Sequence, residues 1–274
     1  MRTGGPAGCA GGQPDPAQDK TGRGNGGRGR GKLTVIGTGP GNLEHLSRRA
    51  LQALAEAEVV VGYKTYIGLI ASLLNDKEVV STGMTREIER CELAIDRARQ
   101  GAAVALVSSG DPGVYGMAGP ALELLARENA LTEIEVEIIP GITSATAAAA
   151  LMGAPLMHDF VVISLSDLLT PWEIIEKRLD LAARGDFVIV LYNPASRKRT
   201  RQVQAAREIL LACKGPQTPV GIVRNAGREG EEIILTDLDK MLAYRVDMFT
   251  VVIIGNSHTY SAGNYLITPR GYRV

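Results

Sequence analysis

Three short turns rich in glycine and proline carry the side chains in this chain that could bind a small polar ligand. They cover residues 37–42, 108–116 and 140–144, and each follows an apolar run typical of a strand. Hydroxyls, the carboxylate of Asp111 and unpaired backbone amides at strand ends can hydrogen-bond to a ligand. The hydroxyls of the third turn could instead cap the helix that follows. Because parallel strands end at one edge of a sheet, we expect the three turns to form one edge of a pocket.

The first turn does not fit either common phosphate-binding pattern. Its sequence, GTGPGN, has Asn42 where the dinucleotide motif GxGxxG requires a third glycine, and the phosphate-loop pattern GxxxxGK[ST] is absent. Pro40 removes one backbone donor and stiffens the turn. The turn therefore suits packing against a flat ligand, and a purely structural turn is an equal alternative.

No residue pattern points to covalent catalysis or to a metal site. The three histidines are isolated from one another: His45, His158 and His258. The three cysteines lie far apart, without metal-ligand spacing: Cys9, Cys91 and Cys213. We therefore expect no protein metal site, no disulfide framework and no Ser/His/Asp or paired-carboxylate chemistry.

Composition and charge exclude several classes of function. The 274 residues include 30 Lys and Arg against 30 Asp and Glu, so no global field attracts a nucleic acid. No apolar run approaches the roughly 20 residues that span a bilayer, and the N-terminus lacks the apolar stretch of a secretion signal. We expect a cytoplasmic protein with a small-molecule substrate and without nucleic-acid or membrane partners.

The segments that must position the turns alternate between strand and helix patterns, as in α/β folds. Residues 1–31 are rich in glycine and contain almost nothing large and apolar, so we expect a disordered extension there. Residues 32–153 and 154–274 are predicted to form an N-terminal and a C-terminal α/β domain, joined near residues 153–159. Ligands commonly bind between domains, so we expect a cleft at this junction.

Hydrophobic periodicity predicts the individual elements. Strands are expected over 33–37, 58–62, 78–81, 103–109, 136–140, 160–165, 187–192, 220–224, 232–236 and 250–255. Helices are expected over 43–54, 65–74, 86–100, 120–128, 143–152, 171–183 and 197–213. The segment GREGEE is typical of a tight turn. The strands expected on either side of it, over 220–224 and 232–236, are therefore predicted to form a hairpin.

Taken together, the motifs resemble those of the tetrapyrrole methyltransferase family. That family has the same order and spacing of GTGPGN, SSGDPGVYG, PGITS, SLSD, LYNP and VRNAGREGEE, over essentially all of residues 32–274. The resemblance implies two α/β domains of the tetrapyrrole methylase type, usually in a homodimer, with S-adenosylmethionine bound in the cleft between them. It also implies these cofactor contacts: Pro40, Ser109, Gly110, Asp111, Val114, Thr143, Ser144, Asn193, Ala226 and Thr250.

Within that family the chain is most similar to the enzymes that methylate carbon 17 of precorrin-3B or cobalt-factor III in cobalamin biosynthesis. The segments that carry this similarity are GYKTYI, SLSDLLTPWEIIEKRL and the ending TPRGY. Methylation in those enzymes accompanies contraction of the macrocycle, so the resemblance implies acid-base chemistry. Tyr63, and Asp167 at the end of a predicted strand of the second domain, are the catalytic candidates. A phenol, with a reference pKa of about 10, is a poor base, so we expect Tyr63 to orient the substrate or donate a hydrogen bond. Asp167 could instead cap the following helix.

Other enzymes of the superfamily are alternatives. They are the tetrapyrrole methyltransferases that act at carbon 11 or 20, an rRNA ribose methyltransferase and diphthine synthase. RNA or protein substrates favour a basic face, whereas this chain beyond residue 31 is slightly acidic. A nicotinamide-dependent oxidoreductase would need an acidic residue where the chain has Gly62 and Tyr63. Whether the substrate already holds cobalt stays open.

Arg197 and Arg199 are predicted to bind the substrate. They follow the LYNP turn at the expected start of a helix, where cations oppose the helix dipole unless an anion compensates. A tetrapyrrole is rimmed with carboxylates that could supply this compensation. The alternative is a solvated basic patch.

Overall fold

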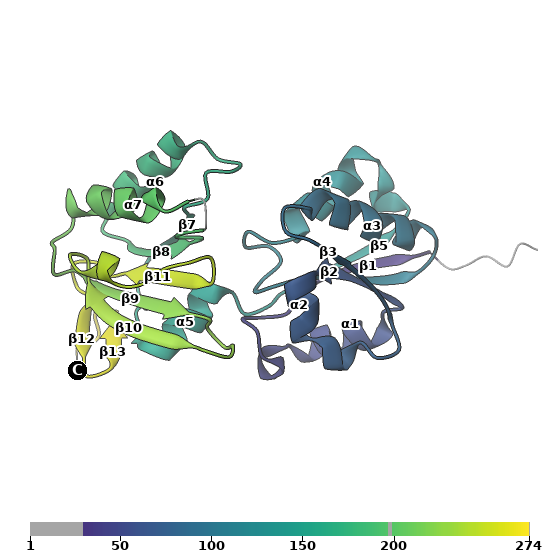
Figure 1. Ribbon diagram of the computed structural model, residues 1–274, viewed down its shortest axis with the longest axis horizontal. Coiled ribbons are helices and arrows are strands. Elements are labelled where there is room, and N and C mark those ends of the chain that lie inside the picture. The colour runs from purple at the N-terminus through teal and green to yellow at the C-terminus, as the bar shows by residue number, and fades with distance from the viewer. Residues whose placement is uncertain (1–29, 197–198, 274) are drawn as a thin grey trace, which may run out of the picture.

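The computed structural model describes residues 30–196 and 199–273, which contain two five-stranded sheets side by side (Figure 1). Residues 1–29 of the predicted extension, together with Arg197, lie outside the described residues. The first sheet has the order β3-β2-β4-β1-β5, and its strands all run parallel. Its strands are β1 (Lys32–Gly37), β2 (Val59–Tyr63), β3 (Glu78–Thr82), β4 (Ala103–Ser108) and β5 (Glu135–Ile139).

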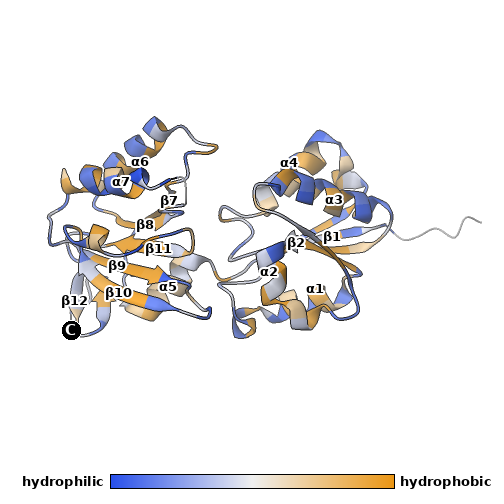
Figure 2. Ribbon diagram, viewed as in Figure 1, coloured by the Kyte–Doolittle hydropathy of each residue, from blue (hydrophilic) through white to orange (hydrophobic). Residues whose placement is uncertain are grey.

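Helices cover both faces of the first sheet, because successive strand residues point to opposite faces and both faces are apolar. The helices are α1 (Arg48–Glu56), α2 (Lys64–Leu69), α3 (Glu87–Arg99) and α4 (Ala118–Arg127). α3 and α4 pack over Leu33 and Leu106, while α1 and α2 pack over Ile36 and Val60. Figure 2 shows these apolar strands between helices whose outer surfaces are hydrophilic.

Two of the predicted helices are interrupted. Ser47 Oγ accepts a hydrogen bond from Ala50 N at 3.1 Å, and this cap begins α1. The helix predicted over 43–54 is therefore a 3-10 turn, η1 (Leu43–His45), followed by α1. Likewise, the helix predicted over 65–74 is α2 followed by the 3-10 turn η2 (Ala71–Leu73).

The second sheet is mixed and has the order β10-β9-β11-β8-β7. Its strands are β7 (Phe160–Ser164), β8 (Val188–Tyr192), β9 (Pro219–Arg224), β10 (Glu232–Asp237) and β11 (Thr250–Ile254). β7 and β8 are parallel and joined by α6 (Trp172–Arg184), whereas the other pairs are antiparallel. β9 and β10 form the predicted hairpin. α6 and α7 (Arg201–Leu211) cover one face of this sheet.

α5 (Ser144–Met152) covers the other face of the second sheet, so the predicted domain boundary at residues 153 and 154 is wrong for this helix. Ala145 and Ala148 share a core with Val190 and Ile253 of the second sheet. The two helix residues are small, which allows close packing but does not indicate against which of the two sheets the helix packs. The change from one core to the other therefore falls before Ser144, in the third glycine turn.

Several short elements were not predicted from the sequence. β6 (Gly153–Ala154), β12 (Tyr260–Ala262) and β13 (Tyr265–Ile267) form a small three-stranded sheet. Strands of two or three residues are too short to show a hydrophobic period. α7 begins at Arg201, later than the predicted position 197, and η3 (Ala130–Thr132) and η4 (Met241–Ala243) are single 3-10 turns.

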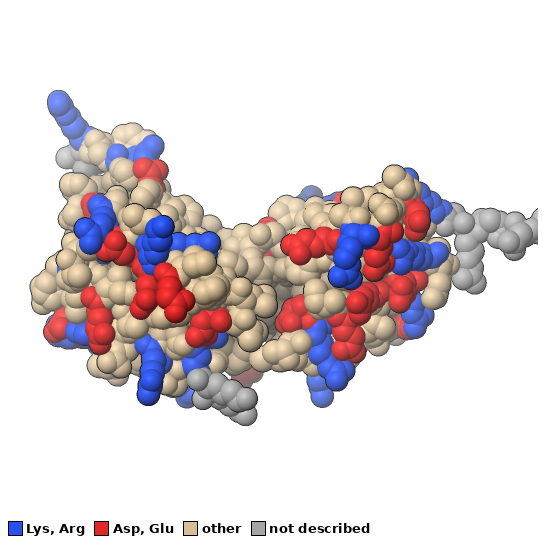
Figure 3. Space-filling model, turned by 90° about the horizontal axis from the view of Figure 1, so that it is seen from above, with Lys and Arg blue, Asp and Glu red and all other residues tan. Residues whose placement is uncertain are grey.

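The surface shown in Figure 3 mixes acidic and basic side chains, without a field of one sign. This distribution agrees with the formal net charge of zero. Over residues 30–196 and 199–273, no helix is both long and apolar enough to cross a membrane. Over the same ranges, no group of His, Cys, Asp and Glu side chains has the geometry to hold a metal ion.

Glu137 on β5 should make the stability of the first domain depend on acidic pH. The Arg49 guanidinium donates to Glu137 at 2.7 Å, and Lys32 Nζ lies 2.9 Å from the same carboxylate, which together lower its pKa to about 2 from 4.5. A pKa that is lower in the folded state stabilises the fold above pH 4.5, and this contribution is lost as the pH falls towards 2. We expect Glu137→Gln to lower the unfolding free energy at pH 7 but hardly at pH 2, measured by urea denaturation across this range. An equal loss at both pH values would contradict the assignment.

Candidate active site

The three glycine turns meet at the carboxyl edge of the first sheet, as predicted, because β4, β1 and β5 are neighbours there. Gly39 and Gly110 exchange two backbone hydrogen bonds of 3.1 and 2.8 Å, which join the first turn to the second. The third turn lies equally close, since a Cβ atom added to Gly141 would lie 2.1 Å from the Gly110 oxygen. Only glycine allows this approach of the three backbones.

Asp111 joins the second turn to the third. Its Oδ1 accepts from Gly113 N at 2.8 Å, and its Oδ2 accepts from Gly141 N at 3.0 Å. Each of its oxygens therefore already binds a backbone amide, and the side chain does not line the pocket described below. In this structure Asp111 shapes the turns, whereas the sequence pattern suggested a direct ligand contact.

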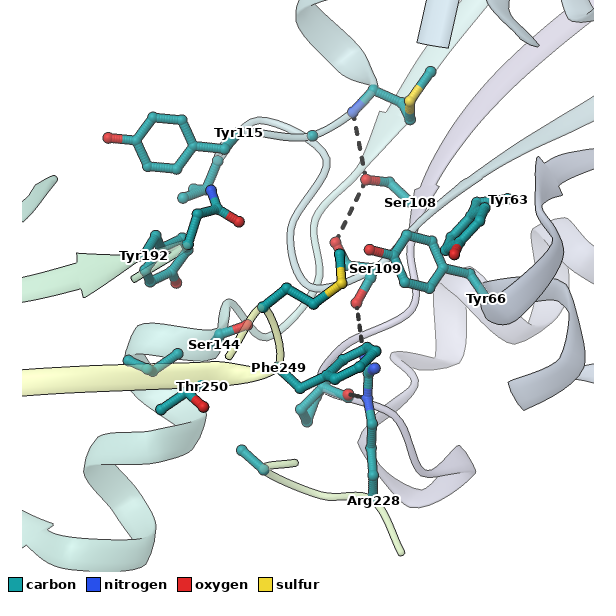
Figure 4. Close-up of a pocket in the computed structure, with 18 of the residues that line it drawn as sticks. Tyr63, Tyr66, Ser108, Ser109, Tyr115, Ser144, Tyr192, Arg228, Phe249 and Thr250 are labelled. Carbon is teal, nitrogen blue, oxygen red and sulfur yellow. Dashed lines mark hydrogen bonds between the residues drawn. The ribbon is translucent and has the colours of Figure 1, made fainter. Parts of the chain in front are cut away.

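A cavity of about 350 Å³ opens beside the turns and is lined from both sheets. This volume lies within the range of small-molecule sites. Figure 4 shows Ser144, Tyr192 and Thr250 on one side of the pocket, Tyr63 and Tyr66 on the other, and Ser109 between them. The residues predicted from sequence that line it are Pro40, Tyr63, Ser109, Val114, Ser144, Asn193, Ala226 and Thr250.

The second sheet contributes asparagines at two strand ends. Asn193 follows β8 and Asn225 follows β9, and both have left-handed backbones, with φ of 51° and 53°. Asparagine tolerates this conformation better than most residues. Asn193 Nδ2 donates to Ser164 Oγ at 3.0 Å, which fixes the amide at the pocket wall.

Tyr192 connects β8 to the start of α5. Its hydroxyl accepts from Ala145 N at 2.6 Å and lies 2.5 Å from Thr143 Oγ1. Burial raises the pKa of the Tyr192 phenol, which keeps it neutral and able to both donate and accept. Thr143 thus supports the pocket through Tyr192 and does not itself line it.

Two other predicted residues bind elsewhere. Asp167 Oδ2 accepts from Gln202 Nε2 at 2.8 Å, away from the pocket and without capping α6. Arg199 donates to the Asn193 oxygen at 2.8 Å and to Ser166 Oγ at 3.2 Å. Arg199 therefore supports the turn after β8 and does not face the pocket, because these nearby acceptors hold its guanidinium.

Several side chains that line the pocket were not predicted from the sequence, among them Tyr66, Arg90, Arg228 and Phe249. Arg228 crosses from the β9–β10 hairpin to donate to the Pro40 oxygen at 2.6 Å and to Ser109 Oγ at 3.0 Å (Figure 4). Burial raises the pKa of Tyr66, and the Tyr63 and Tyr66 rings meet edge to face at 5.0 Å. Arg228 lies within the VRNAGREGEE motif, and this motif is the only feature of the sequence that points to a role for Arg228 in the pocket.

The pocket holds no nucleophile paired with a base. Its polar groups are hydroxyls, amides, two arginines and the carboxylate of Glu87. Such a site can bind and orient two reactants and exclude water, which suits a displacement that needs geometry more than proton transfer.

The fold and the pocket suit an enzyme that orients two reactants, and sequence comparison identifies the class as methyltransferases. Residues 32–242 match the family of Tetrapyrrole (Corrin/Porphyrin) Methylases. The chain belongs to this family, which confirms the resemblance and the predicted α/β fold class.

Similar proteins are named as enzymes that act at carbon 17. A probable cobalt-factor III C(17)-methyltransferase of Salmonella typhimurium is 54% identical over 242 residues, covering 88% of this chain and 100% of the relative. A cobalt-factor III methyltransferase of Priestia megaterium is 50% identical over 89% of this chain, which spans only 46% of that relative. A precorrin-3B C(17)-methyltransferase of Sinorhizobium sp is 42% identical, covering 88% of this chain and 97% of the relative.

Solved structures extend the likeness to the fold. The crystal structure of the methyltransferase CobJ superposes with a TM-score of 0.83 at 40% identity, covering 87% of this chain and 100% of that one. A uroporphyrin-III C-methyltransferase from Thermus thermophilus, complexed with S-adenosylhomocysteine, has a TM-score of 0.63 at 26% identity. The match covers 82% of this chain and 97% of the Thermus thermophilus chain.

Proposed function

We propose that this chain transfers a methyl group from S-adenosylmethionine to carbon 17 of cobalt-factor III, as a step of cobalamin biosynthesis that includes ring contraction. The observation that carries this proposal is the pocket where the three glycine turns meet the strand ends of the second sheet. The relatives named for this reaction support it, and the 54% identity to a cobalt-factor III enzyme against 42% to a precorrin-3B enzyme favours the cobalt-containing substrate.

The donor set of the pocket fits S-adenosylmethionine. The hydroxyls of Ser109 and Ser144 and the amide of Asn193 can bind the polar groups of the cofactor. Val114 and Ala226 offer apolar surface to its flat base. When bound, the cofactor supplies a methyl group on a positively charged sulfur, and that charge disappears as the methyl group leaves.

The chain contributes orientation and the exclusion of water. The hydrogen bonds between Gly39 and Gly110 and those of Asp111 fix the turns before any ligand arrives, so little reorganisation is needed. Tyr63 lies at the side of the pocket opposite Ser144, where its phenol can orient the macrocycle or donate a hydrogen bond (Figure 4). Asp167, held by Gln202 outside the pocket, is a weaker candidate for acid-base chemistry.

The reaction can be tested with S-adenosylmethionine labelled in its methyl group. We expect transfer to cobalt-factor III with the label at carbon 17, located by NMR of the product, and slower transfer to precorrin-3B. Ala226→Phe fills the pocket and should abolish transfer, while Ala262→Phe on the exposed strand β12 is the matched control. Label at another carbon, or no transfer to either substrate, would contradict the proposal.

A further inference from the structure

Two arginines line the pocket without an acidic partner. Arg90 is 3% exposed, and its guanidinium donates to Thr82 Oγ1 at 2.8 Å, to the Gly83 oxygen at 2.9 Å and to Met117 Sδ at 3.5 Å, all neutral acceptors. Arg228 is half-buried and likewise donates only to Pro40 and Ser109. Within residues 30–196 and 199–273, no carboxylate oxygen lies within 4.0 Å of either guanidinium.

Burial of an arginine without a counter-charge is unfavourable. Arginine stays protonated in proteins, so it cannot escape the cost of desolvation by losing its proton. Hydrogen bonds to neutral oxygens and the ring of Tyr63, whose centroid lies 5.9 Å from the Arg90 guanidinium, compensate only in part. Burial lowers the pKa of Arg228 for the same reason.

The two cations lie on the same side of the pocket. Arg90 faces Tyr63, and Arg228 lies 6.0 Å from the centroid of Tyr66, whose ring contacts that of Tyr63. Figure 4 places both tyrosines opposite Ser144 and Thr250, two of the predicted cofactor contacts, while Ser109, to which Arg228 donates, lies between the two groups. The carboxylate that lines the pocket, Glu87, is exposed and forms no ion pair with either arginine.

We propose that Arg90 and Arg228 form an anion subsite that binds a carboxylate side chain of the tetrapyrrole macrocycle. This inference rests on the proposed function and names the residues that recognise its substrate. The subsite takes over the role predicted for Arg199, because that guanidinium is held by Asn193 and Ser166. The prediction for Arg197 lies outside the described residues and stays a prediction. A carboxylate supplies the missing counter-charge and can accept two parallel hydrogen bonds from a guanidinium.

The test uses uroporphyrin III, an octacarboxylate tetrapyrrole, as a fluorescent probe of the full-length chain. We expect Arg90→Gln and Arg228→Gln each to weaken its binding by about 10- to 100-fold, as for loss of a charged hydrogen bond. The affinity of both variants should also depend less steeply on NaCl concentration, a change that a purely structural role would not produce. Arg97→Gln, on the same helix as Arg90 but half-buried, outside the pocket and paired with Glu78, is the matched control and should bind as the unmodified chain does.

Titration of the same proteins with S-adenosylhomocysteine separates the possible failures. If the unmodified chain does not bind S-adenosylhomocysteine, the proposed function is wrong. Two other results would contradict the anion subsite while leaving the proposed function intact, provided that the unmodified chain binds S-adenosylhomocysteine. One is that both arginine variants bind uroporphyrin III with unchanged affinity. The other is that the unmodified chain does not bind uroporphyrin III. Should Arg90→Gln fail to fold, Arg90→Lys and Arg228→Gln decide the question.

Discussion

Gly141→Ala is expected to lower the affinity for S-adenosylhomocysteine at least about 10-fold and to destabilise the chain by about 1–3 kcal/mol. The added Cβ atom would lie 2.1 Å from the Gly110 oxygen and 2.8 Å from the Gly37 carbonyl carbon. Both neighbours are backbone atoms of turns held by strand ends, so they cannot move aside as a flexible side chain would. The third turn must therefore separate from the other two, which opens the edge of the pocket.

Calorimetric titration and thermal unfolding measure these two effects. Gly119→Ala is the matched control, because its Cβ atom would meet nothing within 4 Å and Gly119 lies inside helix α4. Alanine is favoured over glycine within helices, and Gly119 lies in the first turn of α4, so this variant should be at least as stable as the unmodified chain. Binding by Gly141→Ala with unchanged affinity would show that the close approach of the turns is not required.

Asp111→Ala is expected to have the second large effect, and to change the protein even without ligand. The substitution removes two charge-assisted hydrogen bonds, to Gly113 N and Gly141 N, each of which contributes about 1.5–3 kcal/mol. Asp111→Asn should be nearly as harmful, because an amide presents a donor to one of the two backbone N–H groups. Both variants should unfold at a lower temperature than the unmodified chain and bind S-adenosylhomocysteine more weakly.

This experiment distinguishes a structural Asp111 from one that contacts the ligand. A contact residue would change the affinity while leaving the unfolding temperature of the free protein unaltered. Asp76→Asn removes the same charge from an exposed loop and serves as the control. An unaltered unfolding temperature in Asp111→Asn would restore the interpretation drawn from the sequence pattern.

Much of the fold follows from the sequence, because buried parallel strands are continuous apolar runs. The segments 59–63 and 103–108 are of this kind, and their strands were predicted to within one residue. Helix α5 was predicted to within one residue and placed in the N-terminal domain, whereas it packs on the second sheet. Its alanines are small on every side, so periodicity carries no information about its partner. The strand β12 is too short for any periodic signal.

The parts of the site that lie at strand ends could be predicted from the sequence. The parts that depend on contacts between residues distant in the sequence could not. The turns around Gly39, Gly110 and Gly141 converge because neighbouring parallel strands end together. Arg228 reaches Pro40 across 188 positions of sequence, a contact that no local pattern contains. Arg199 was predicted to bind the substrate because of its position after a turn, but its guanidinium donates a hydrogen bond to the nearby backbone oxygen of Asn193.

A crystal structure of the chain with S-adenosylhomocysteine is the most direct test of the claim that the glycine turns build the cofactor site. We predict ligand density within the cavity that Ser109, Ala226 and Thr250 line, beside the turn that holds Gly110. Density at any other position, or a cavity that stays empty in crystals grown with saturating ligand, would contradict the account.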